Sequence, residues 1–134
     1  MLRAKLSNSS LRLLQTFAKR LVAFANTKGG TLYIGVEDNG TVVGVNSSDR
    51  VTLQINNMVR DSIKPDITMF VHYETQVIDD KQIIAVTVQE GTDRPYYLGS
   101  NYRKVIAPKG RFDDIKEYLV SSYYKKRNLP DSVT

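Results

Sequence analysis

Apolar residues recur at helical spacing in three parts of the chain. The first series runs from Leu11 to Ala25, follows Ser9 or Ser10 as a helix cap, and ends at Gly29-Gly30. The second predicts a helix after Ser47-Ser48-Asp49 that ends before Lys64-Pro65, with five residues on its inner side: Val51, Ile55, Met58, Val59 and Ser62. We expect a third helix over residues 111–126, with an inward face of Ile115, Tyr118, Leu119 and Ser122.

Between these helices, the chain alternates in the manner of β-strands. Residues 31–37 and 41–45 flank the turn Asp38-Asn39-Gly40, which predicts a hairpin. Residues 67–78 and 82–89 predict a second hairpin, in which Ile84, Val86 and Val88 share one face. Short strands are expected over 96–98 and 102–106. This order predicts an α+β fold, with a mostly antiparallel sheet built from hairpins and helices packed on it.

Length and composition indicate one globular domain. The chain has 134 residues, and we assign residues 1–127 to the domain and 128–134 to a C-terminal tail or the start of a linker. It has no cysteine and one histidine, which excludes disulfides, thiolate metal sites and a histidine-rich metal site. We expect no cofactor or metal. No signal peptide or membrane span is indicated, so the expected location is the cytoplasm.

Charge is unevenly distributed along the chain. Residues 1–36 hold six basic residues and no acid, residues 37–93 hold ten acids against four bases, and residues 94–134 hold nine bases against four acids. If the two basic ends meet in space, they form a positive face suited to the phosphates of a nucleic acid. The alternative is a solvated surface with scattered lysines and arginines.

One glycine-rich stretch carries a specific resemblance. Residues 23–40, which end the first helix and form the first strand and turn, are followed by Val43-Gly44-Val45. This stretch, together with the tyrosine- and arginine-containing segment 94–103, resembles the Schlafen Alba-like family, also called the divergent AAA domain. The resemblance implies an Alba-like α+β domain that binds nucleic acid, with DNA as the expected ligand, as the N-terminal module of a transcription regulator or a helicase-like protein.

The candidate contacts to nucleic acid are basic residues in the two cationic segments, together with polar groups of the glycine-rich stretch. Asn26 and Thr27, with the amides of Gly29-Gly30, form a candidate anion nest, although these glycines also have a purely structural interpretation. Tyr96, Tyr97 and Tyr102 are candidates for stacking on bases. The candidate phosphate-binding side chains are Lys19, Lys28, Arg103, Lys104, Lys109 and Arg111.

Two alternative functions follow from the same residues. The resemblance also implies metal-dependent RNA cleavage in some relatives, with acidic ligands on a strand before the first helix and after the first strand. Here Asp38, with its neighbour Glu37, matches only the second position, and no acid precedes Glu37. Asp38 also suits a turn, so the sequence favours a binding domain over a nuclease. The other alternative is a non-catalytic module that forms a homodimer through a sheet edge or the tyrosine-rich end.

Overall fold

The computed structural model describes residues 8–37, 39–108, 112 and 115. Helix α1 (Asn8–Ala25) and strand β1 (Gly30–Ile34) are the first of the described elements, and helix α2 (Ser48–Ser62) and the two-residue strand β2 (Ile63–Lys64) follow. A 3-10 turn, η1 (Thr68–Phe70), leads into the hairpin of β3 (Val71–Ile78) and β4 (Lys81–Val88). Strand β5 (Tyr97–Leu98) and the short helix α3 (Tyr102–Ile106) follow. The predicted α+β class is confirmed.

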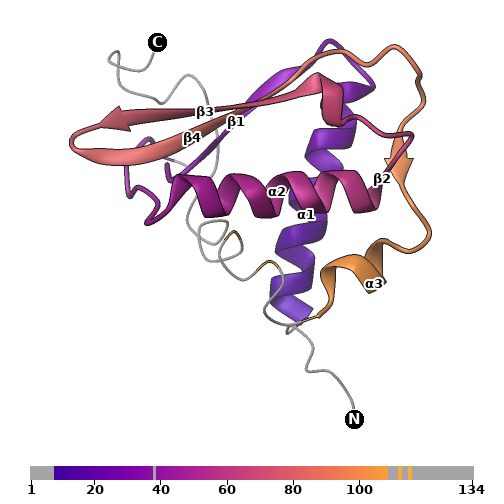
Figure 1. The fold of residues 1–134 in the computed structure, drawn as a ribbon, viewed down its shortest axis with the longest axis horizontal. Helices are drawn as coiled ribbons and strands as arrows, with labels where there is room; N and C mark the ends of the chain where they lie inside the picture. Colours follow the sequence, from indigo (N-terminus) through magenta and orange to yellow (C-terminus); the bar gives the residue numbers. More distant parts are fainter. Residues whose placement is uncertain (1–7, 38, 109–111, 113–114, 116–134) are drawn as a thin grey trace.

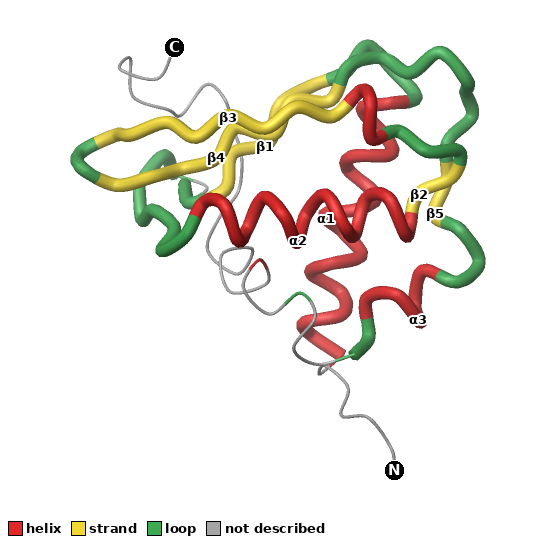
Figure 2. The backbone as a smooth tube through the Cα atoms, in the orientation of Figure 1, coloured by secondary structure: helices red, strands yellow, loops and turns green. Residues whose placement is uncertain are grey.

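The main sheet is antiparallel and has β4 at its centre. Its order is β1-β4-β3, with Thr31 opposite Thr87 on one side of β4 and Glu74 opposite Ala85 on the other. A separate two-stranded sheet joins β2 to β5. Figure 1 shows α1, α2 and α3 on the same side of the main sheet, while the β3–β4 hairpin extends beyond them. The same layers are visible in Figure 2, where the strands are yellow and the helices red.

Helix α2 forms where local signals predicted it. The Ser47 hydroxyl oxygen accepts a hydrogen bond from the Arg50 N–H at 3.4 Å, which caps the first turn. All five residues predicted on its inner side are buried. The four apolar ones, Val51, Ile55, Met58 and Val59, belong to the main core between the helices and the sheet, which also contains Leu14, Leu21 and Ile84. Phe112 and Ile115 are buried in this core too, whereas the rest of the predicted 111–126 helix lies outside the described residues.

The predicted return strand over residues 41–45 is wrong. Only an isolated bridge between Val36 and Val42 remains of the expected hairpin, and β1 pairs with β4 instead. Gly35 has φ +97°, a conformation that suits glycine, and its carbonyl accepts hydrogen bonds from both the Val43 and the Gly44 N–H (2.8 and 2.9 Å). The chain therefore folds into a compact loop after β1. This loop helps to form a second, smaller core on the other face of the sheet, containing Tyr33, Val36, Val42, Ile78, Ile83 and Ala85.

Two other strand predictions need correction. Residues 102–106 form helix α3 rather than a strand, because adjacent residues Val105 and Ile106 are both buried in one core. In a strand these neighbours would point to opposite faces. The predicted strand over 67–78 starts only at Val71, since η1 occupies its first part. The strands predicted over 82–89 and 96–98 are confirmed, since β4 and β5 form close to these bounds.

Candidate nucleic-acid interface

Asn26, a candidate contact in the sequence, is engaged inside the protein. Its Nδ2 donates to the Tyr96 carbonyl at 3.0 Å, and its Oδ1 accepts from the Tyr96 N–H at 2.7 Å. The hydroxyl of Thr27 donates to the Ala23 carbonyl at 2.8 Å. Asn26 thus joins the end of α1 to the start of β5, a contact between segments 70 residues apart. The amide is committed to this link, although Thr27 is exposed.

One N–H group of the predicted anion nest is also hydrogen-bonded within the protein. The Gly29 N–H donates to the Phe24 carbonyl at 3.0 Å, so it closes the end of α1 and does not face an anion. Gly30 begins β1 and lies opposite Val88. Close packing favours glycine here, because an added Cβ on Gly30 would lie 2.5 Å from the Phe24 ring. The structural interpretation of the two glycines accounts for both contacts.

Lys28 is exposed at this same end of α1, close to a loop that carries acids. The Gly91 N–H donates to the Ala25 carbonyl at 2.9 Å, which holds residues 89–94 against the helix end. In that loop Arg94 pairs with Glu90 at 3.1 Å, and its guanidinium also donates to the Asn26 carbonyl at 3.4 Å. Glu90 and Asp93 are exposed there. Lys28 therefore lies at an end of the helix that carries both acidic and basic side chains, which weakens its attraction for a polyanion.

The outward face of α1 is cationic and free of acids. Residues Leu14, Phe17, Ala18, Leu21 and Ala25 are buried, and the opposite side exposes Arg12 and Lys19. These two lie seven residues apart, which is nearly two helical turns, so they share a face about 10 Å apart along the axis. The helix contains no aspartate or glutamate at any position. Arg12 was not among the sequence candidates, although its spacing from Lys19 on an amphipathic helix was a usable signal.

Helix α3 exposes two further candidates, Arg103 and Lys104. Both are exposed, whereas the next two residues of this short helix, Val105 and Ile106, are buried, so the two charges face outward. The Arg103 guanidinium carbon lies 5.6 Å from the centre of the Tyr102 ring, within the range of a cation–π contact. The Tyr102 ring is thereby partly covered. The helix has no acidic residue.

The three candidate stacking tyrosines have different environments. Tyr96 is only 3% exposed, and its hydroxyl accepts a hydrogen bond from the Asp93 N–H at 2.8 Å, so this ring is part of the core. Tyr97 is 56% exposed on β5. Tyr102 is half-buried beneath Arg103. Of the three rings, Tyr97 has the surface that stacking on a base requires.

The basic candidates fall into two groups. Helix α3 lies near the beginning of α1, whereas Lys28 follows the opposite end of that helix (Figure 1). An 18-residue helix is about 27 Å long, so Lys28 is well separated from Arg103 and Lys104. Lys19 lies on α1 between the two ends. Lys109 and Arg111 lie outside the described residues.

Of the two acidic candidates, only Glu37 lies within the described residues, and it belongs to no cluster of metal-ligating side chains there. Glu37 is half-buried in the loop after β1, where its N–H donates to the Thr41 carbonyl and its carbonyl accepts from the Gly40 N–H, both at 2.8 Å. Asp38 lies outside the described residues. In the part of the chain that is described, no three His, Cys, Asp or Glu side chains gather as metal ligands would. The nuclease alternative remains an untested prediction.

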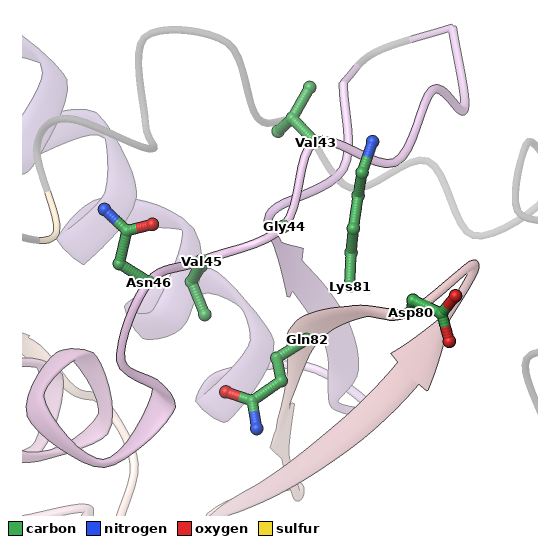
Figure 3. Close-up of a pocket in the computed structure, with 7 residues that line it drawn as sticks. All are labelled: Val43, Gly44, Val45, Asn46, Asp80, Lys81 and Gln82. Atoms are coloured by element: carbon green, nitrogen blue, oxygen red, sulfur yellow. The ribbon is translucent and has the colours of Figure 1, made fainter.

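An open polar hollow lies at the other side of the molecule, by the β3–β4 turn. It has a volume of about 500 Å³ and is lined by the loop that follows β1 and by the start of β4. Figure 3 shows Lys81 reaching along this loop, and its Nζ donates to the Val42 carbonyl at 3.3 Å. The lining also includes Asp80, so the hollow has no excess of positive charge. It contains none of the candidate phosphate-binding residues.

Burial raises the pKa of two tyrosines in the fold. Tyr73 on β3 is the more affected, and burial alone accounts for its raised pKa. Its hydroxyl donates to the Asn56 Oδ1 on α2 at 3.4 Å. For Tyr33 on β1, burial contributes most to the raised pKa, and the nearby charge of Glu74 adds to it. Both hydroxyls stay protonated at neutral pH and so act as neutral groups.

Comparison with known proteins places the chain in a family. The family model described as Schlafen, AlbA_2 matches residues 3–126, which is nearly the entire chain. No curated protein and no solved structure matches it. None of the helices in the described part of the chain is long and apolar enough to cross a membrane.

Proposed function

The chain belongs to the Schlafen AlbA_2 family, and we propose that it is a nucleic-acid-binding domain, with DNA as the first ligand to test. In a longer protein, such a domain would hold a transcription regulator or a helicase-like enzyme on its nucleic acid. The proposed contact surface consists of Arg12 and Lys19 on α1 and Arg103 and Lys104 on α3. We call it the α1–α3 cationic surface.

The acid-free outward face of α1 is the observation that carries this proposal. Arg12 and Lys19 are about 10 Å apart along the helix, a length equal to about three base-pair steps along the axis of a duplex. Arg103 and Lys104 add two exposed charges from a helix near the beginning of α1. Such contacts bind the sugar–phosphate backbone and carry no base sequence, so we expect binding with little sequence preference.

Lys28 has a secondary place in this proposal. It is exposed, but the acids of the 89–94 loop lie at the same end of α1, and Asn26 is committed to Tyr96. Tyr97, whose ring is open to solvent, is the candidate for a contact to an unpaired base. A preference for single strands would therefore involve Tyr97, whereas duplex binding would not require it.

A binding titration with charge-reversed variants tests the proposal. Fluorescence anisotropy is measured with single- and double-stranded DNA and RNA of the same sequence at two salt concentrations. Reversal of two charges, Arg103→Glu with Lys104→Glu, should weaken binding by about tenfold or more, because two attractive contacts become repulsive. Each single reversal is also measured, and its control is Lys81→Glu, which reverses one charge at an exposed position on the β3–β4 hairpin, outside the proposed surface. Unchanged binding to all four ligands by the double variant would refute the assignment.

A further inference from the structure

Among the described residues, no strand covers the outer edge of β3. In the described part of the chain, β3 pairs with β4 and with no other strand, so one side of Val71–Ile78 has no strand partner. It is eight residues long, contains no proline or lysine, and has a single charged residue, Glu74. Exposed edges in monomeric proteins usually carry lysines, prolines or bulges that block pairing with another strand. β3 has none of these residues.

The hydrogen-bond pattern shows which backbone groups face this edge. The Gln89 N–H, just after β4, donates to the Phe70 carbonyl at 2.8 Å, so the backbone carbonyl of Phe70 points toward the β4 side just before β3 begins. In an antiparallel ladder, such residues alternate with residues whose N–H and C=O point the other way. The register continues unbroken from Val71 opposite Val88 to Ile78 opposite Lys81. Backbone donors and acceptors therefore face outward at Val71, Tyr73, Thr75 and Val77.

We propose that two copies of this chain pair through β3, antiparallel, with Thr75 on the two-fold axis. The side chains distinguish between the two registers that overlap most of the strand, with the axis at Glu74 or at Thr75. An axis at Glu74 would place two carboxylates directly opposite each other, which is destabilising. An axis at Thr75 instead places Glu74 opposite the partner's Gln76. These two side chains are suited to one another, since within one chain the Gln76 Nε2 already donates to the Glu74 Oε1 at 2.6 Å.

The same register explains an exposed apolar side chain. Val77 is 64% exposed, although it lies on a regular strand and on the face of the sheet that packs against the helices. With Thr75 on the axis, Val77 lies opposite the partner's Tyr73, and the two-fold axis repeats this pair. Aromatic and β-branched residues are favourable cross-strand neighbours. The dimer would thus have one continuous sheet of six strands, and the Val77 side chain of each copy would be covered by Tyr73 of the other.

Single cysteines test the register, because the chain has none of its own and a lone thiol can form a disulfide only between molecules. Across a two-fold axis at Thr75, the two Cα atoms of Thr75→Cys would be about 5.5 Å apart, within disulfide range. Those of Glu74→Cys would be diagonal neighbours, about 7–8 Å apart. We expect Thr75→Cys to form a linked dimer roughly ten times faster than Glu74→Cys under mild oxidation. Equal rates, or faster linkage of Glu74→Cys, would overturn the proposal.

Sedimentation velocity of the unmodified chain, without nucleic acid, is the companion measurement and is independent of the proposed function. The pairing buries little surface, so we expect a monomer at low micromolar and a dimer at high micromolar concentration. Val77→Lys should remain monomeric throughout, since it removes the apolar pair and blunts the edge. Leu53→Lys, which adds the same charge at an exposed position on α2, should still dimerise. A native chain that stays monomeric throughout refutes the pairing.

Discussion

The side-chain amide of Asn26 and the backbone of Tyr96 form a two-way hydrogen bond, with distances of 3.0 and 2.7 Å. Asn26 follows the last turn of α1, and Tyr96 begins the segment that leads to β5. One side chain therefore satisfies both the N–H and the C=O of a buried residue. This link holds together two parts of the chain that are far apart in the sequence.

Removal of the Asn26 amide should destabilise the fold. Asn26→Ala leaves the Tyr96 backbone groups without a partner, so we expect the free energy of unfolding to fall by about 1–3 kcal/mol in urea denaturation. Thr27→Ala is the neighbouring control and should cost less, because its hydroxyl is exposed and bonds only within its own helix end. A stable Asn26→Ala protein that no longer binds nucleic acid would contradict this structural role.

Gly29 should tolerate substitution less well than Gly30. Gly29 has φ +86°, and a Cβ there would collide with the Val88 carbonyl oxygen, which is fixed in the sheet. At Gly30 the colliding atoms belong to the Phe24 ring, which can turn away. Gly29→Ala should lower the free energy of unfolding by about 2 kcal/mol or more, and Gly30→Ala by less. Thermal and urea denaturation of both variants check this order, and a reversed order would contradict the packing described above.

Stability should decline at alkaline pH partly because of Tyr73. Burial raises the pKa of its hydroxyl in the folded state above the ordinary value of 10.0, so the unfolded chain releases this proton first. The stabilisation is complete below pH 10.0 and is lost as the pH rises toward the folded-state pKa. Tyr73→Phe removes the titrating group. Urea denaturation between neutral pH and pH 11 should therefore show a smaller alkaline loss for the variant, and parallel losses would refute the prediction.

The sequence predicted the elements whose signals are local. Helix α2 has its cap at Ser47 and its apolar face within its own residues, and both were correct. The strand partner of β1 was not predictable in this way. Thr31 lies opposite Thr87, and the positive φ of Gly35 turns the chain away from the expected hairpin. In α3, the β-forming residues Tyr102, Val105 and Ile106 favoured a strand, but packing against the core selected a helix.

The candidate site shows the same division between local and distant signals. Lys19, Arg103 and Lys104 are exposed, as a role in phosphate binding requires. The role of Asn26 depends on Tyr96, 70 residues along the chain, and no local pattern indicates that pairing. The separation of Lys28 from α3 likewise follows from how α1 packs in three dimensions.

The salt dependence of DNA binding tests the α1–α3 cationic surface most directly. With four phosphate contacts, a plot of the logarithm of the binding constant against the logarithm of the salt concentration should have a slope of about −3.6. The double variant Arg12→Gln with Lys19→Gln should reduce the steepness of that slope by about 2, since two contacts are lost, while its thermal stability stays unchanged. A folded double variant with the affinity and slope of the native chain would contradict the account.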